Sequence, residues 1–276
     1  MHGFPSSFLL LFYQISLGGL FVIAATPFHK LERGFYKSTV GVLFVLSLLG
    51  LLGKAELYRE SNLSGISLGI RLEIVIYLFY VLCFGLYLYS LWGEYILLRA
   101  RIFSISLLVG VAGLSLSSHS FYQAPFWSVE TFLYPVSFLL SALLLGSVTV
   151  GMLIGHWYLI DTGQSIEPFI RVFKFFVIAL IIQSIFFLFL PLLLYLFGNP
   201  RTVMGLQTIW NDHFTLLLIR LSVAQGGALV LAYLIWQTLK IPHTMAATGL
   251  FYISLLGVFV GEMLGRRILA LSSLPF

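Results

Sequence analysis

The chain has 276 residues, of which 60% are hydrophobic and only 9% are charged, and its formal net charge is +5. A soluble domain carries roughly a quarter of its residues as charged side chains, so this composition excludes a water-soluble fold. The small basic excess is typical of membrane loops and gives no reason to expect nucleic acid as a partner. The single cysteine, Cys83, excludes a disulfide or a cysteine-ligated metal cluster within the chain.

The apolar runs are near-continuous and about twenty residues long, which is the length that crosses a lipid bilayer as a helix. We therefore predict an all-α integral membrane protein, a bundle of eight transmembrane helices that forms one domain over 1–276. The first run is too long for the core of a signal peptide, so we expect it to remain as the first helix. The predicted spans are 6–28, 36–53, 71–92, 100–118, 131–157, 172–197, 214–239 and 245–267.

Loop charges predict the orientation, because Lys and Arg are enriched in cytoplasmic loops. The loops after the odd-numbered helices hold eight such residues: Lys30, Arg33, Lys37, Arg99, Arg101, Arg171, Lys174 and Lys240. The other side holds six: Lys54, Arg59, Arg71, Arg201, Arg266 and Arg267. We expect a multi-pass protein of a prokaryotic inner (cytoplasmic) membrane, with both termini outside.

The connection between the fourth and fifth helices, 118–131, is aromatic and carries Glu130 as its one charged residue. Such a segment is typical of the headgroup level of a bilayer. Two readings stay open, an aromatic belt without a ligand and a portal or docking lip for a lipophilic molecule or a partner subunit.

A weak internal repeat divides the chain into the halves 1–118 and 131–276. The sequence Ile-Ser-Leu-Leu occurs at 105–108 in the fourth helix and again at 253–256 in the eighth. Two four-helix repeats in parallel orientation would follow, since four is an even number of spans.

Small residues recur at a spacing of four in two helices, on one face of each. Residues at this spacing let helices approach closely in a membrane. We therefore expect the fifth and eighth helices to be central to the bundle. The residues are Ser147, Gly151 and Gly155 in the fifth helix and Gly257, Gly261 and Gly265 in the eighth.

Charged residues within the apolar spans are candidates for function, because burying them in lipid is costly. Glu262 and Arg266 lie four residues apart and can form an ion pair on the eighth helix. The alternative is that Arg266 and Arg267 reach the interface and neutralise Glu262 there. Arg220 and Gln225 lie inside the seventh helix, and Arg220 needs an acceptor such as Glu262. A polar pocket between these two helices is expected.

Histidines lie near the ends of the predicted helices, and imidazole is both a haem ligand and a hydrogen-bond donor. His156 is our candidate for a hydrogen bond to a quinone carbonyl, beside the alternative of an interfacial histidine without a ligand. A b-type haem between facing histidines is a further alternative, which the lack of any mid-span histidine disfavours. The other histidines considered are His29, His119, His213 and His243.

Three stretches resemble the membrane anchors of the NrfD and DMSO-reductase type. The first helix carries Gln14 and Gly18 in a Gln-x-x-x-Gly start, and the eighth ends in a Glu-x-x-Gly-Arg pattern at 262–266. The run 135–146 is similar to their Pro-x-x-Phe-x-x-Ser-x-x-x-x-Gly pattern. The Leu-His-Leu-Gly segment of the DMSO-reductase type is absent, since 53–56 reads Gly-Lys-Ala-Glu. The resemblance therefore assigns no quinone-binding histidine in this chain.

This resemblance implies a cofactor-free, quinone-interacting subunit of a respiratory electron-transfer complex, docked to an iron–sulfur or multihaem cytochrome subunit. Its bound substrate would be menaquinone or ubiquinone. From their positions in the spans, and not from the resemblance, our quinone or proton-handling candidates are His156, Arg220, Gln225, Glu262 and Arg266. Two other classes stay open, a transporter or channel for a small solute and a structural or assembly subunit. Signatures of a self-sufficient catalytic centre, such as His-Glu-x-x-His, Gly-x-Ser-x-Gly or a phosphate loop, are absent from the sequence.

Overall fold

A computed structural model describes residues 3–26, 30–60, 68–94, 96–121, 125, 127–161, 163–241 and 243–276. Eight helical spans in this part of the chain are long and apolar enough to cross a membrane, and it contains no strand. The predicted all-α bundle of eight spans is therefore confirmed. The elements are α1 (Phe4–Ala25), α2 (Arg33–Glu60), α3 (Leu68–Ser90), α4 (Ile96–His119), α5 (Glu130–Ile160), α6 (Glu167–Phe197), α7 (Pro200–Asp212), α8 (Phe214–Leu221), η2 (Ser222–Gly227), α9 (Ala228–Lys240) and α10 (Thr244–Ser272).

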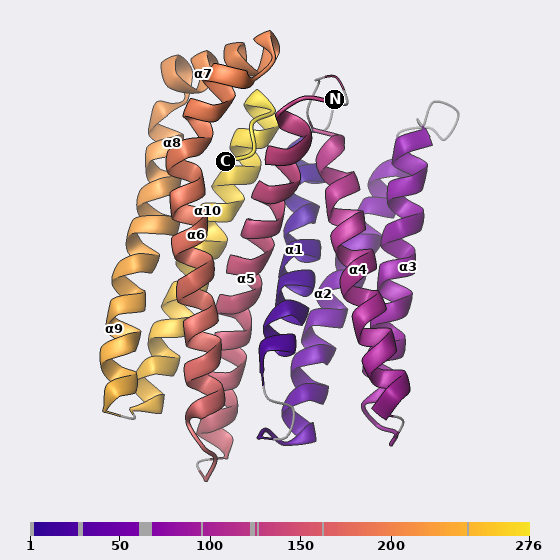
Figure 1. The fold of residues 1–276 in the computed structure, drawn as a ribbon, viewed down its shortest axis with the longest axis vertical. Coiled ribbons are helices and arrows are strands. Elements are labelled where there is room, and N and C mark those ends of the chain that lie inside the picture. The colour runs from indigo at the N-terminus through magenta and orange to yellow at the C-terminus, as the bar shows by residue number, and fades with distance from the viewer. Residues whose placement is uncertain are drawn as a thin grey trace.

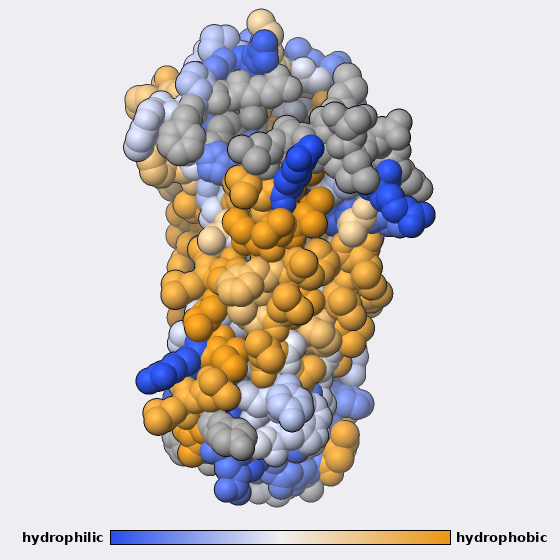
Figure 2. All heavy atoms as spheres, turned by 90° about the vertical axis from the view of Figure 1, so that its right-hand side faces the viewer, coloured by the Kyte–Doolittle hydropathy of each residue, from blue (hydrophilic) through white to orange (hydrophobic). Residues whose placement is uncertain are grey.

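The surface matches a chain that has lipid as its solvent. On the face that Figure 2 shows, an orange apolar band covers the middle of the molecule, and hydrophilic residues gather toward its two ends. Each span satisfies its backbone hydrogen bonds internally, as a helix must in hydrocarbon. The chain is a multi-pass membrane protein.

The helices α1 and α5 form the centre of the bundle (Figure 1). Two glycines allow their close approach, because a Cβ at Gly18 would lie 1.7 Å from the carbonyl oxygen of Ala142. A Cβ at Gly146 would lie 2.0 Å from the carbonyl carbon of Gly18. The helices α2, α3 and α4 lie on one side of this pair, and α6 and α8–α10 lie on the other.

The predicted small-residue faces make different contacts. On α5, the Cβ positions of Gly151 and Gly155 face Phe251 and Thr248 of α10, so these glycines join the two helices. On α10, a Cβ at Gly261 would lie 2.1 Å from the Cβ of Ala224, whereas a Cβ at Gly257 would make only an ordinary contact with the Val223 carbonyl oxygen at 3.8 Å. Ser147 is buried and donates to the carbonyl of Leu144. The fifth helix is therefore central, while α10 packs between it and the α8–α9 span.

The predicted helix ends need correction. The second span continues to residue 60, so Lys54 and Arg59 belong to a helix instead of a loop. Arg99, Arg101, Arg171 and Lys174 likewise lie inside α4 and α6. Apolarity marks only the part of a helix within hydrocarbon, and these helices continue beyond it. Most of these basic side chains reach water there, whereas Lys54 is buried.

The predicted connection between the sixth and seventh spans contains a further helix, α7, which runs across the end of the bundle (Figure 1). Its N-terminus is capped by the Asn199 side chain, which accepts from the Arg201 N–H at 3.3 Å, and Pro200 occupies the first turn. Glu130 anchors the same turn by accepting the Asn199 N–H at 2.6 Å and the Thr202 hydroxyl at 2.8 Å. This helix is too short and too polar to have been recognised from hydropathy.

The aromatic segment 118–131 is described only in part, since 122–124 and 126 lie outside the described residues. Trp127 is 83% exposed, while Glu130 is fully buried under α7. This pattern does not separate the aromatic belt from the docking lip, so both readings stay open.

Candidate functional site

A carboxylate lies between two guanidinium groups in the second half of the bundle. Glu262 of α10 accepts from Arg220 of α8 at 3.4 Å and from Arg266, one turn along α10, at 3.3 Å. The three side chains are 0 to 2% exposed. Arg266 therefore points inward and only Arg267 is exposed, so the alternative that Arg266 reaches the interface is wrong.

Polar side chains from α5, α6 and η2 extend this ion cluster. The amide nitrogen of Gln183 donates to Glu262 at 2.8 Å and to the Ser141 hydroxyl at 3.1 Å. The amide of Gln225 donates to the Gln183 oxygen at 3.1 Å, and Ser184 donates to the Gln225 oxygen at 2.7 Å. The result is a continuous hydrogen-bonded chain, which we call the Glu262 network, from buried Arg266 to the half-buried Ser184.

A π-helical segment places Arg220 and Gln225 in the same network. In an α-helix, residues five apart point in clearly different directions. The π-helix closes its hydrogen bonds from i to i+5 and therefore turns by a smaller angle per residue than an α-helix. The segment Ser222–Gly227 therefore turns Gln225 toward α6 while Arg220 faces α10. Such segments are frequent at functional sites.

Aromatic rings cover the two arginines within the apolar core. The Arg220 guanidinium lies 4.4 Å from the ring centre of Phe187, and that of Arg266 lies 4.8 Å from Phe138. These cation–π contacts stabilise the two charges where water is excluded.

The Glu262 network has more donors than acceptors. Its charged members are two arginines and one glutamate, which gives a formal charge of +1 by simple addition. Nε and Nη1 of Arg220 and Nε of Arg266 are buried and have no hydrogen-bond partner. Unsatisfied buried donors are unusual in native structures. The network is chemically suited to hold an additional acceptor, such as a carbonyl oxygen or an anion.

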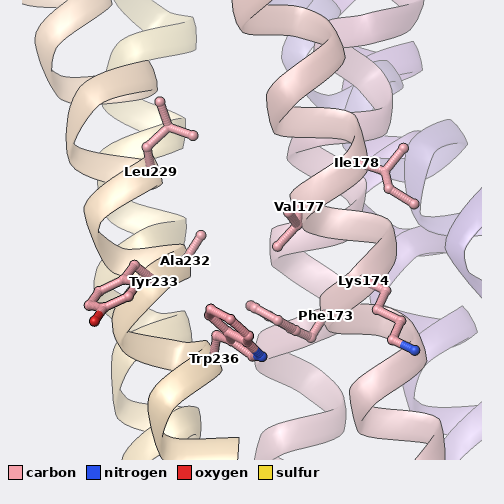
Figure 3. A pocket seen from close by; sticks show the side chains of 8 residues that line it. All are labelled: Phe173, Lys174, Val177, Ile178, Leu229, Ala232, Tyr233 and Trp236. Atoms are coloured by element: carbon pink, nitrogen blue, oxygen red, sulfur yellow. The ribbon is translucent and has the colours of Figure 1, made fainter.

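An apolar groove opens to the lipid side between α6 and α9, with a volume of about 440 Å³ (Figure 3). Phe173 and Val177 of α6 point toward Trp236 and Ala232 of α9 across it. Its other lining residues are Lys174, Ile178, Leu229 and Tyr233. Gln225 lies one turn before Leu229, and Gln183 lies five residues after Ile178, or about 7.5 Å along the helix. Ser184 and Gln225, at one end of the Glu262 network, therefore lie one to two turns beyond the groove on the same two spans.

The structure brings together four of the five polar candidates and leaves out His156. Arg220, Gln225, Glu262 and Arg266 share one network. His156 is exposed near the opposite end of α5 and lies 3.3 Å from the Tyr252 hydroxyl. Tyr252 precedes Glu262 by ten residues, which is about 15 Å of helix. His156 is therefore a surface residue outside the network.

The histidines considered for haem lie at helix ends. His119 ends α4, His213 lies between α7 and α8, and His243 directly precedes α10. His29 lies outside the described residues. Within the described part of the chain, no group of three or more His, Cys, Asp or Glu residues is placed to hold a metal ion.

Hydropathy missed Gln183, Ser141 and Ser184, the α5 and α6 members of the network. Gln183 is the one polar amide in the span 172–197, and it could have been noticed as an isolated polar residue in an apolar helix. Serines in membrane helices usually bond their own backbone, so nothing in the sequence marked Ser141 or Ser184.

A second buried ion pair, Lys54 of α2 with Glu73 of α3, was not predicted, because Lys54 was assigned to a loop and Glu73 to the first turn of the third span. Their spacing of nineteen residues across a connection gives no local signal of pairing.

No family model matches this sequence, and no curated protein is significantly similar to it.

Proposed function

We propose that this chain is the quinone-interacting membrane subunit of a multi-subunit electron-transfer complex, as the resemblance to NrfD-type anchors implies. The observation that carries the proposal is the Glu262 network, which has unpartnered arginine donors at one end. Its other end lies one to two turns along the same spans from a lipid-facing aromatic groove. The proposed location is a prokaryotic cytoplasmic membrane, with both termini outside.

The groove fits the physical chemistry of a quinone. Menaquinone and ubiquinone are dissolved in the bilayer, so their site must open toward lipid, as the space between α6 and α9 does. Phe173 and Trp236, which lie between α6 and α9, offer ring faces for a flat headgroup (Figure 3). A quinone carbonyl accepts hydrogen bonds, and Ser184 and Gln225 are the nearest network members that could supply them.

The arginines would stabilise the negatively charged, reduced forms of the quinone. Adding electrons to a quinone places negative charge on its oxygens until protons arrive. A buried network with a formal charge of +1 stabilises that charge, because water does not screen it. The electrons themselves would come from an iron–sulfur or multihaem cytochrome subunit bound to this chain.

A photoreactive quinone analogue tests the site directly. In purified protein, we expect saturable labelling within 173–178 of α6 and 229–236 of α9, displaced by excess ubiquinone-1 or menadione. Trp236→Leu should weaken labelling by about tenfold, consistent with the loss of one aromatic stacking partner. Trp210→Leu, at an exposed tryptophan of α7, is the control and should leave it unchanged. Labelling that is not saturable, or that lies on other helices, would contradict the proposal.

A transporter for a small carboxylate is the second candidate, because the same unpartnered arginine N–H groups suit an anion and the seventh span is interrupted by a π segment. Thermal stability in detergent separates the two candidates. Ubiquinone-1 or menadione should raise the melting temperature if the quinone proposal is right, whereas stabilisation by succinate alone would favour transport.

A further inference from the structure

A second buried ionic cluster lies in the other half of the bundle and takes no part in the proposed quinone site. The Lys54 ammonium of α2 pairs with Glu73 of α3, and the Ser117 hydroxyl of α4 donates to the same carboxylate. Lys54 also lies 3.5 Å from Ser117, and the Tyr58 hydroxyl lies 3.4 Å from the second Glu73 oxygen. The side chains of Lys54 and Glu73 are 5% and 2% exposed.

The pair lies close beneath one end of the bundle. Lys54 is six residues from the end of α2, and Glu73 is five residues from the start of α3. These separations correspond to about 8–9 Å of helix, so Tyr58, one turn beyond Lys54, lies between the pair and the helix end. A short proton transfer connects Glu73 with water at the end of the molecule where α1 begins and α10 ends (Figure 1).

Three tyrosines continue the cluster toward the membrane centre. Tyr77 is one turn after Glu73, and its ring centre lies 4.3 Å from that of Tyr13, which stacks on Tyr80 at 4.8 Å. Tyr13 donates to the Gly110 carbonyl at 3.0 Å, while the buried Tyr77 hydroxyl has no partner. Tyr80 and Ser16 share a hydrogen bond of 3.1 Å. Below them, Leu20, Val40, Leu43 and Phe84 are fully buried and close the path.

The chemistry of this pair differs from that of the Glu262 network. An arginine guanidinium keeps its proton under all conditions met in proteins, so a glutamate between two arginines is a fixed charge. A buried lysine can release its proton. Moving one proton from Lys54 Nζ to Glu73 Oε1 turns two buried charges into a neutral amine and a neutral carboxylic acid, with no oxidant or reductant required.

We infer that Lys54 and Glu73 form a proton-exchange site in the α2–α3–α4 part of the bundle. In its reaction, the Nζ–H bond breaks and an O–H bond forms on Glu73. The acid proton then leaves through the hydroxyl groups that face the carboxylate, Tyr58 toward the helix end and Ser117 toward α4. Lys54 regains a proton from water. The groups facing Glu73 are Lys54 and Tyr58 of α2, Ser117 of α4, Tyr13 of α1 and, on its own helix, Tyr77.

Dicyclohexylcarbodiimide tests the inference, because this membrane-soluble reagent adds to a carboxyl group in its protonated form and leaves a stable acylurea. Glu73 and Glu262 are both buried in the same molecule, so each serves as the reference for the other. In the intact protein, mass spectrometry should show Glu73 modified at least about tenfold faster than Glu262, because only Glu73 has a partner that can give up a proton. Modification of Glu73 no faster than Glu262 would overturn the inference.

Two variants sharpen the test. Glu73→Gln should abolish the modification at position 73, which shows that the reagent reacts with the Glu73 carboxyl group. Lys54→Arg keeps the positive charge but removes the transferable proton, so modification of Glu73 should fall to the level of Glu262. An unchanged rate in a Lys54→Arg protein with wild-type melting temperature would overturn the role of Lys54. If the Lys54→Arg variant does not fold, the comparison of Glu73 with Glu262 in the wild-type protein still tests the proton-exchange site. None of these outcomes depends on quinone binding.

Discussion

Glu262 and Glu73 are both buried carboxylates, and the identity of their cationic partners gives them different consequences for the protein. Glu262 is held by two arginines that lie under aromatic rings. Glu73 is held by one lysine and two hydroxyl groups. The first arrangement fixes charges in place, and the second allows a proton to move.

Replacing Glu262 with Gln should strongly destabilise the protein. The change keeps the shape of the side chain but leaves Arg220 and Arg266 buried without a counter-charge. Removing one partner of a buried ion pair costs about 3–5 kcal/mol. We expect a lower melting temperature in detergent and a lower yield of folded protein.

Charge compensation is the control for this prediction. The double change Glu262→Gln with Arg266→Gln restores the formal charge of the cluster to +1, so it should recover part of the lost stability. Glu94→Gln, at an exposed position, should have almost no effect. Wild-type stability of Glu262→Gln would show that this carboxylate is not needed to balance the arginines.

The histidines predict the optical spectrum of the purified chain. Four histidines that could ligate haem lie within the described residues, and each is at or near a helix end: His119, His156, His213 and His243. His156 is also exposed. Purified alone, the chain should therefore show no reduced α-band of a b-type haem. A stoichiometric band that is lost in His156→Ala would instead establish the haem alternative.

The identity of the residues alone was enough to recognise some members of the Glu262 network and not others. Arg220 and Glu262 stand out in any apolar span, because their burial is costly. Whether Arg266 or its neighbour Arg267 points inward depends on the helix phase, which the α10 packing against α5 and η2 decides. Gln183 joined the network only because α6 places it beside Glu262.

At the scale of elements, the π segment and the glycines of α10 depend on one another. The η2 backbone packs closely on α10, and a Cβ at Gly261 would lie 2.1 Å from the Cβ of Ala224. The π segment thus needs a residue without a side chain opposite it. Ala224 directly precedes Gln225 in the sequence, so the contact between Ala224 and Gly261 also helps to hold Gln225 in the Glu262 network.

Gly261→Ala should therefore destabilise the protein, because a methyl group would push η2 away from α10. Overpacking of a filled core costs about 1–3 kcal/mol, and the melting temperature in detergent should fall accordingly. Gly257→Ala is the matched control on the same face, since its Cβ would meet only the Val223 carbonyl oxygen at 3.8 Å. Equal melting temperatures for the two variants would contradict the proposed close packing.

At the scale of the whole molecule, eight spans require that the two chain ends emerge on the same side of the membrane. The start of α1 and the end of α10 lie toward the same end of the bundle (Figure 1). The Glu262 network and the Lys54–Glu73 pair lie in different halves, with α1 and α5 between them. The two sites can therefore be studied separately by mutation.

Reporter fusions measure the orientation. The basic residues that follow α1, α3 and α5 predict cytoplasmic loops there. Fusions after Glu32, Gly93 and Gly163 should therefore report the cytoplasm, and fusions after Gly65 and Gln123 should report the outside. A consistent reversal of all five would place both termini in the cytoplasm and leave the eight-span fold intact.

The sequence by itself determined the fold class, the number of spans and the approximate place of each, because burial in lipid acts on every residue of a span and sums to a strong local signal. This signal did not identify the helix ends or α7, because hydropathy alone does not distinguish a polar helical segment from a loop. Only the tertiary structure decided which polar side chains meet. Arg220 and Glu262 are 42 residues apart, and Lys54 and Glu73 are 19 apart. Such contacts arise from helix packing and from one π-helical segment, and no local property of the chain encodes them.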